Sequence, residues 1–264
     1  MPQVKGATEQ DLSFDVILTT HNRLDLTIAC VKALYNYTPI PFNLIVIDES
    51  SDLTPQFFDS FCKEHSNCKY LRFEPSQLKC CNHCWLLGLE HCTKDIVVTL
   101  VNSTTVEPNW FSYPLSLLND NPQVGAIGIK LLYPHGIIWH AGKDFFNSLP
   151  GHMGLGEPAH RCTHIIEVKA INHSVGFFRK EVLAKSLDID TYIGWRSFED
   201  DDLCLTIRKN GYKILYCGFA SAYHIESPTR LVDNPDKQRF WAEHNENMRR
   251  FLTKWQGNSL LERI

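Results

Sequence analysis

The sequence predicts an α/β protein in which a mostly parallel central sheet is flanked by helices. Short apolar runs rich in β-branched residues alternate with stretches of helical period, and several of these runs end in polar residues. Strands that are apolar on both faces are typical of a parallel sheet covered by helices on both sides. Ligands of such sheets bind beyond the carboxyl ends of the strands, so the polar strand ends are candidate site residues.

The first half of the chain contains the regular part of this pattern. Strands are predicted at residues 14–20, 43–47, 70–73 and 95–101, and helices at residues 24–37, 54–65 and 78–92. Polar residues follow three of the strands, at positions 19–23, 48–51 and 102–105. We expect these three segments to surround one crevice.

The pattern is less regular after residue 105. A helix is predicted at residues 108–118, and a strand at 124–133 pairs with 137–140 as a hairpin. Residues 143–165 read as a long loop, followed by a strand at 170–179, a helix at 180–185 and strands at 212–217 and 220–224. An amphipathic stretch, residues 237–255, predicts a C-terminal helix over the site. Without repeats or a clear linker, residues 1–264 are expected to form one domain.

Composition and missing motifs exclude several functions. A formal charge of −4, without a long basic run, argues against a nucleic-acid-binding protein. No G-x-G-x-x-G follows the first strand and no G-x-x-x-x-G-K-[ST] occurs, which disfavours a Rossmann dehydrogenase and a P-loop NTPase. The polar N-terminus and short apolar runs predict a soluble, cytoplasmic protein without a transmembrane segment.

Four consecutive acids, residues 199–202, open a helical pattern that ends at Asn210-Gly211. At helical spacing Asp200, Leu203 and Ile207 share one stripe, so Asp200 should face apolar neighbours and Asp201 should face elsewhere. Partial burial raises the pKa of a carboxyl group, so Asp200 could act as a base near neutral pH. The alternative is a well-capped surface helix with solvated acids.

Four cysteines and two histidines cluster between residues 80 and 92: Cys80, Cys81, Cys84, Cys92, His83 and His91. They could form a zinc site. The same stretch also reads as a helix with small residues on its packed face, and buried free thiols are common in reducing compartments. Packing is therefore the default interpretation, and a zinc-binding interaction module remains the alternative.

Five segments carry a pattern when they are taken in order. They are residues 16–23 (V-I-L-T-T-H-N-R), 45–51 (I-V-I-D-E-S-S), 124–142 (with L-L-Y-P-H-G and H-A-G), 198–203 (F-E-D-D-D-L) and 223–227 (Y-H-I-E-S). In this order, from residue 14 to about 227, the chain resembles glycosyltransferase family 2, which comprises inverting enzymes of the GT-A fold. The resemblance implies a Rossmann-like, mostly parallel sheet with a smaller antiparallel acceptor-side part and a C-terminal helix.

The resemblance also implies a division of labour along the chain. Residues 14–105 would bind the nucleotide sugar, residues 106–230 would form the acceptor and catalytic half, and residues 231–264 would be a helical extension. On the donor side, Asp48 and Glu49 would hold the base and ribose. Other donor-side residues would be Thr19, His21, Arg23, Asn102 and Ser103.

On the other side of the reacting carbon, Asp200 would be the general base and Glu199 would shape the acceptor site. Gly194, Trp195 and His140 would line the acceptor side, where an aromatic face can stack on a sugar. His224 would face the diphosphate or its metal, Mn²⁺ or Mg²⁺. The expected reaction is transfer from a nucleotide-diphosphate sugar, such as a UDP-sugar, to a hydroxyl of a glycan or small acceptor.

One segment departs from the family. Where members carry D-x-D-like acids, this chain reads L-V-N-S-T-T-V-E-P-N-W, and Ser103 stands in the place of the metal-binding aspartate. Divalent cations prefer carboxylate oxygens. Either the metal is weakly held, or Lys and Arg neutralise the diphosphate, or transfer has been lost. We favour a working enzyme with weakened metal dependence, and the alternative is a catalytically impaired protein that binds sugar nucleotides or glycans.

Overall fold

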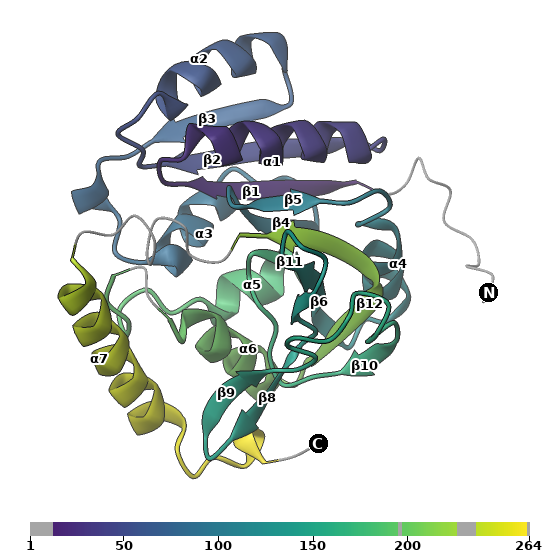
Figure 1. The fold of residues 1–264 in the computed structure, drawn as a ribbon, viewed down its shortest axis with the longest axis vertical. Helices are drawn as coiled ribbons and strands as arrows, with labels where there is room; N and C mark the ends of the chain where they lie inside the picture. The colour runs from purple at the N-terminus through teal and green to yellow at the C-terminus, as the bar shows by residue number, and fades with distance from the viewer. Residues whose placement is uncertain (1–12, 195–196, 226–235, 263–264) are drawn as a thin grey trace.

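The computed structural model describes residues 13–194, 197–225 and 236–262 (Figure 1). Within them, ten strands form one sheet whose main path runs β10-β12-β6-β11-β4-β1-β2-β3. The first four strands are β1 (Phe14–Thr20), β2 (Phe42–Asp48), β3 (Cys68–Arg72) and β4 (Ile96–Val101). β1 is parallel to β2 and β4, and β2 is parallel to β3. The predicted regular half is confirmed.

The remaining elements complete the sheet and its cover. The strands are β5 (Thr104–Val106), β6 (Val124–Leu132), β7 (Ile138–His140), β8 (Lys143–Phe146), β9 (Leu149–His152), β10 (Ile165–Glu167), β11 (Val175–Arg179) and β12 (Lys213–His224). The helices are α1 (Leu24–Tyr37), α2 (Thr54–Glu64), α3 (Cys81–Leu89), α4 (Ser112–Asp120), α5 (Lys180–Ser186), α6 (Glu199–Lys209) and α7 (Lys237–Trp255). Two 3₁₀ turns cover Pro75–Gln77 and Ser259–Leu261.

The strands separate two apolar cores because successive side chains point to opposite faces. In β1, Val16 and Leu18 pack in the core that includes residues of α1, α2 and α4. Ile17 packs in the other core, with residues of α3, α5, α6 and α7. Figure 1 shows α1 and α2 near β1–β3 at the top of the view, and α6 and α7 in its lower half. The sheet is therefore covered on both faces, as predicted.

The second half of the sheet is partly antiparallel. β11 lies antiparallel between β4 and β6, and β12 runs parallel to β6. The two strands predicted at residues 212–217 and 220–224 are one strand, with an irregular register between Cys217 and Ser221. β7 pairs back on β6, which confirms the predicted hairpin.

The predicted long loop at residues 143–165 is wrong in part. β8 and β9 form a separate two-stranded sheet, and β10 starts at Ile165. Asn147 and Ser148 make the β8–β9 turn with positive φ angles of 50° and 65°. Several predicted elements are shorter or shifted. The strand predicted at 170–179 begins at Val175, the helices predicted at 54–65 and 78–92 cover Thr54–Glu64 and Cys81–Leu89, and the helix predicted at 108–118 covers Ser112–Asp120.

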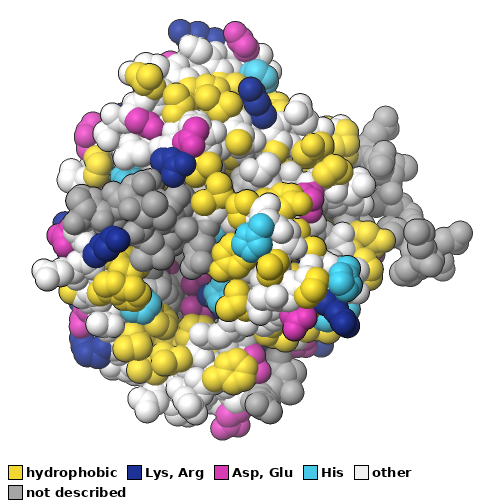
Figure 2. Space-filling model, in the orientation of Figure 1, with side chains coloured by type: hydrophobic (Ala, Val, Ile, Leu, Met, Phe, Trp, Pro, Cys, Tyr) yellow, Lys and Arg dark blue, Asp and Glu magenta, His cyan; other side chains and the backbone are white. Residues whose placement is uncertain are grey.

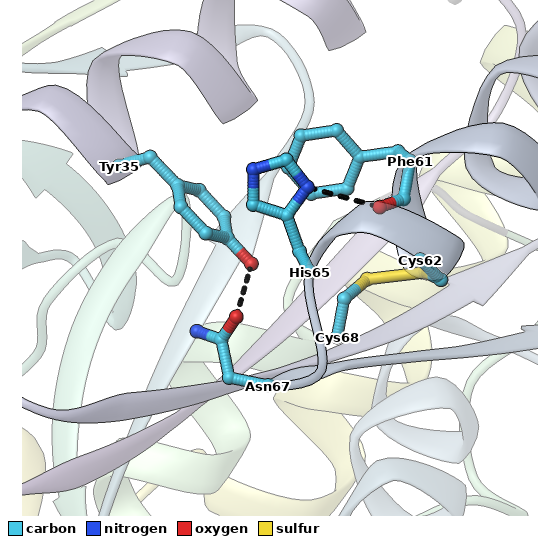
Figure 3. Close-up of a disulfide and its surroundings, with 6 residues drawn as sticks. All are labelled: Tyr35, Phe61, Cys62, His65, Asn67 and Cys68. Carbon is cyan, nitrogen blue, oxygen red and sulfur yellow. Dashed lines mark hydrogen bonds between the residues drawn. A yellow bond between two sulfur atoms is a disulfide. The ribbon is translucent and has the colours of Figure 1, made fainter.

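A disulfide joins Cys62 at the end of α2 to Cys68 at the start of β3 (Figure 3). The turn between them is also held by side chains. His65 stacks on Phe61 with ring centroids 3.9 Å apart. The Tyr35 hydroxyl donates to Asn67 Oδ1 over 3.0 Å, so the turn is fastened to α1.

Across the described residues, no helix is both long and apolar enough to cross a bilayer.

Candidate active site

The carboxyl ends of β1, β2 and β4 meet at one cleft, as the sequence predicts. The cleft has a volume of about 1560 Å³ and extends from these strand ends past the start of α6 to α7. Ten of the predicted site residues line it: Thr19, His21, Arg23, Glu49, Asn102, Ser103, Gly194, Glu199, Asp200 and His224. Figure 2 shows acidic and histidine side chains in a hollow near the centre of this face.

Two predicted residues are not brought to the cleft surface. Asp48 and His140 are fully buried. Trp195 lies outside the described residues, so its predicted place on the acceptor wall is not described.

Asp48 holds the neighbouring loop together instead of facing the cleft. Its Oδ1 accepts from the Thr20 hydroxyl (2.7 Å) and the Ser50 amide (3.0 Å). Its Oδ2 accepts from the Tyr70 hydroxyl (2.8 Å) and the Arg72 guanidinium (3.3 Å). A ligand group could reach this carboxylate only by displacing one of these donors, which leaves Glu49 as the nearest predicted acid on the cleft surface.

The loop after β1 has an unusual backbone. Asn22 and Arg23 both have positive φ angles, of 55° and 61°. Asn22 Oδ1 accepts from the Ser51 amide (2.7 Å), and Asn102 Nδ2 donates to the Asn22 carbonyl (2.8 Å) and to Thr27 Oγ1 (3.0 Å). The left-handed conformation is one that asparagine tolerates better than most residues. Asn102 therefore supports the loop after β1 as well as lining the cleft.

His21 and Glu49 form an ion pair in the cleft, beside the ends of β1 and β2. His21 Nδ1 lies 3.0 Å from Glu49 Oε1, and the carboxylate is only 3% exposed. The hydrogen bond with Glu49 raises the pKa of His21, although burial works against it. The pair therefore places a readily protonated histidine beside the loop where a diphosphate is expected.

Ser103 and His224 occupy the place expected for the metal. Ser103 Oγ lies 3.5 Å from His224 Nδ1, Thr104 Oγ1 lies 3.0 Å from the same atom, and Ser174 Oγ lies 3.4 Å from Nε2. Hydroxyl groups thus surround the ring. Among the described residues, no three His, Cys, Asp or Glu side chains gather as a metal site. Hydroxyls are poor substitutes for carboxylates as ligands of Mn²⁺ or Mg²⁺, so these residues do not fit a tightly held cation.

The first turn of α6 presents its acids in a different way from the prediction. Asp200 faces the cleft with its side chain 19% exposed, and Asp201 is the more buried of the two. Lys143 Nζ lies 2.8 Å from Asp200 Oδ2 and 2.8 Å from Asp201 Oδ1. The expectation that Asp201 faces elsewhere is wrong because one buried ammonium binds both carboxylates.

The pKa values of the two acids move apart. Burial would raise the pKa of Asp200, but the charge and hydrogen bond of Lys143 outweigh it and hold this pKa well below its usual range. Burial and the charge of Asp200 raise the pKa of Asp201. The predicted upward shift at Asp200 is therefore wrong: its carboxylate is ionised throughout the physiological range.

Asn172, which precedes β11, is a second hydrogen-bond donor to Asp200. Its side-chain Nδ2 lies 3.3 Å from Asp200 Oδ2, and its backbone N–H donates to His140 Nε2 over 3.2 Å. His140 also contacts His152, with 3.3 Å between their Nδ1 atoms. Burial lowers the pKa of both histidines, so they are neutral at pH 7. His140 therefore supports Asn172 from behind the cleft.

Sequence reasoning missed Lys143 and Asn172. Lys143 directly follows the H-A-G segment, but it fell in a stretch read as loop, and a single lysine gives no signal of burial. Asn172 fell inside a predicted strand. Neither residue has a local pattern that ties it to an acid 57 or 28 positions away.

The cysteine segment does not gather as a ligand set. Cys81 and Cys84 have C-x-x-C spacing on α3, and Cys80, Cys84 and Cys92 are buried. Burial raises the pKa of the Cys84 thiol well above its usual value, as is typical of a thiol packed in an apolar core. Cys84 and Cys92 belong to the apolar core, and Cys81 packs against it. Packing is thus the better interpretation.

The helix α7 forms a wall of the cleft, as predicted. Its cleft-lining residues are Arg239, Phe240, Trp241, Glu243, His244 and Met248. Near its other end, Trp255 Nε1 donates to Asp202 Oδ1 over 2.6 Å, and Lys254 Nζ lies 2.9 Å from the same oxygen. The acid Asp202 of α6 therefore anchors the helix that forms this wall of the cleft.

Comparison with known proteins agrees with this geometry. The sequence profile of the family described as "Glycosyl transferase family 2" matches residues 15–155. A curated relative, "Uncharacterized protein y4gI" of Sinorhizobium fredii (strain NBRC 101917 / NGR234), is 28% identical over 253 residues. That alignment covers 90% of this chain and 27% of the relative, so the chain spans about a quarter of that protein.

Three solved structures share the fold. GalNAc-T7 with UDP, GalNAc and Mn²⁺ has a TM-score of 0.65 at 14% identity, covering 94% of this chain and 52% of that one. The mannosyltransferase PcManGT of Pyrobaculum calidifontis, in complex with GDP-Man and Mn²⁺, has a TM-score of 0.60 at 15% identity, and the match covers 89% of this chain and 64% of that one. TarS 1–349 of S. aureus has a TM-score of 0.57 at 14% identity, and the match covers 96% of this chain and 75% of that one. These likenesses confirm the predicted GT-A architecture.

Proposed function

This chain belongs to glycosyl transferase family 2, and from that premise we propose that it transfers a sugar from a nucleotide-diphosphate donor to an acceptor hydroxyl, with inversion. The observation that carries the proposal is the placement of Asp200. An ionised carboxylate faces a cleft whose other end is formed by the loops after β1 and β2. Structures of the same fold with UDP or GDP-Man bound support a nucleotide-sugar donor, and we favour UDP.

In the proposed reaction, the acceptor oxygen forms a bond to the anomeric carbon while the bond from that carbon to the diphosphate breaks. The electron pair leaves with the diphosphate, and the acceptor proton passes to Asp200. Lys143 and Asn172 hold the receiving carboxylate in place. Glu199, 5% exposed on the same turn, would shape the acceptor site beside Gly194.

His21 and Arg23 would stabilise the leaving diphosphate at the donor side. His21 lies beside Glu49, and Arg23 lies 2.9 Å from Asp25. Both side chains line the cleft. Positive charge aimed at a developing anion is among the largest sources of rate enhancement. Under this proposal the donor half is residues 14–105, the acceptor and catalytic half is 106–230, and 231–264 is the helical extension.

The variant Asp200→Asn tests the proposal. Donor binding is measured by thermal shift with UDP-glucose, UDP-N-acetylglucosamine, UDP-galactose and GDP-mannose, because a bound donor stabilises the fold. Turnover is measured as release of nucleotide diphosphate. We expect the variant to keep the donor-induced shift and to lose roughly 100-fold or more of its turnover. Undiminished turnover contradicts the assignment of Asp200.

The alternative is a protein of the same fold that binds sugar nucleotides or glycans without transfer. It is favoured by the absence of a carboxylate at Ser103 and of a three-ligand metal site among the described residues. Donor binding by the unmodified protein without turnover, with and without manganese, would support this alternative.

A further inference from the structure

An exposed indole stands at the rim of the cleft. Trp241, on α7, is 52% exposed and lines the cleft together with Phe240 and His244. A large aromatic side chain left half in water within a cleft is a feature of binding surfaces.

The indole is fixed in position by its neighbours. Phe240 packs at 85° to it with ring centroids 5.0 Å apart, and His244 packs at 78° and 5.5 Å. His244 Nδ1 also lies 2.6 Å from Ser197 Oγ, and its ring lies 5.5 Å from that of Phe198. Ser197 and Phe198 directly precede α6, so one side chain separates the indole from the segment that leads into Asp200.

The same helix also brings charged groups to the cleft. Arg239 Nε and Glu243 Oε1 form an ion pair of 2.8 Å, and both residues line the cleft. A pyranose ring has an apolar face of C–H groups and a rim of hydroxyls. A cleft wall that offers an indole face and, elsewhere on the same helix, charged hydrogen-bonding groups matches such a ring. Aromatic acceptors would match the indole but would leave the polar groups without use.

We propose that Trp241 forms an acceptor subsite that stacks on a pyranose ring, so that the acceptor is an oligosaccharide and not a small alcohol. The inference rests on the proposed function, since it assumes that the acceptor hydroxyl is delivered to Asp200. The loops after β1 and β2 form the donor side. The sugar next to the reacting unit then lies outward, against α7.

The experiment compares binding of the labelled protein to an array of immobilised monosaccharides and oligosaccharides. Trp241→Ala removes the platform, and Trp241→Phe keeps a smaller aromatic face. Phe219→Ala is the matched control, because Phe219 is 49% exposed and does not line the cleft. We expect the unmodified protein, Trp241→Phe and Phe219→Ala to bind a common set of oligosaccharides. Trp241→Ala should bind them roughly tenfold more weakly or worse.

Three results would overturn the subsite: equal binding by Trp241→Ala, equal binding to monosaccharides and oligosaccharides, or no bound glycan for the unmodified protein. Donor-induced thermal shift and hydrolysis of UDP-sugars by water are measured on the same samples. Donor turnover without any effect of Trp241→Ala on glycan binding rejects the subsite and leaves the proposed function standing. Glycan binding that depends on Trp241 without any donor turnover rejects the proposed transfer instead.

Discussion

Lys143 Nζ and Asp200 Oδ2 lie 2.8 Å apart, and the same ammonium lies 2.8 Å from Asp201 Oδ1. Two adjacent buried carboxylates would otherwise share a proton, because like charges in contact raise one pKa strongly. Lys143 lets Asp200 stay ionised and moves the upward shift to Asp201. The acid that faces the cleft is therefore in its base form at neutral pH.

Replacing Lys143 with methionine should impair transfer through the charge of Asp200. Without the ammonium, the pKa of Asp200 rises, so the base is partly protonated near pH 7. We expect the acidic limb of the kcat profile to move upward by about 1–3 pH units. The kcat should fall at pH 6 and recover toward pH 9.

The matched control for this variant is Lys169→Met. Lys169 is also buried, with its Nζ 3.0 Å from Asp144 Oδ1, but it does not line the cleft. Its loss should lower stability and leave the pH–rate profile in place. A Lys143→Met profile that matches the unmodified enzyme would show that Lys143 does not set the charge of Asp200.

The His21–Glu49 pair should make stability depend on pH. The folded pKa of His21 is raised above its ordinary value of 6.5, so the charged form is favoured by folding. The added stability is complete below the unfolded pKa and is lost as pH rises through the folded pKa. Because His21 is 47% exposed, the effect should be at most about 1 kcal/mol.

The measurement is the free energy of unfolding in urea, from pH 5 to pH 9, for the unmodified protein and His21→Gln. The difference between the two proteins should shrink as pH rises past 6.5. A difference that is constant with pH would assign the effect of His21 to packing and not to its charge.

Asp202 should contribute to stability through α7. Its carboxylate is fully buried and accepts from Trp255 Nε1, with Lys254 beside it. Asp202→Ala leaves the buried indole N–H without an acceptor, and we expect a loss of about 1–3 kcal/mol in the free energy of unfolding. Trp255→Phe keeps most of the packing and should cost less. Equal stability of Asp202→Ala and the unmodified protein would contradict this anchoring.

The part of the site at the ends of β1, β2 and β4 could be predicted because its signals are local. The apolar runs of β1, β2 and β4 and the polar residues after them are contiguous in sequence, and parallel pairing brings their ends together. The acids of α6 were found for the same reason. Asp48 shows the limit, since its burial depends on Tyr70 and Arg72 of β3, which are more than 20 positions away.

The part of the site around Asp200 was less predictable because long-range pairing determines it. β8 and β9 have four residues each, and β9 contains a proline and a glycine, so neither strand has a readable period. Lys143, the first residue of β8, therefore gave no signal. The antiparallel course of β11 also follows from its partners β4 and β6 and not from its own residues. The predicted upward shift in the pKa of Asp200 is wrong for the same reason: the sequence indicates that Asp200 is partly buried, but it does not indicate that Lys143 lies beside it.

Metal dependence should be weak and should be strengthened by one substitution. Ser103 Oγ lies 3.5 Å from His224 Nδ1, and no third ligand joins them among the described residues. We expect a chelator to leave a measurable part of donor turnover, and Ser103→Asp to lower the half-saturating Mn²⁺ concentration by roughly tenfold or more, because Mn²⁺ prefers carboxylate oxygens. Thr105→Asp adds the same charge on β5 outside the cleft and should leave the Mn²⁺ response unchanged. Complete loss of turnover with the chelator, restored by Mn²⁺ in the unmodified protein, would show instead that donor phosphates and the remaining residues hold the metal tightly without the aspartate.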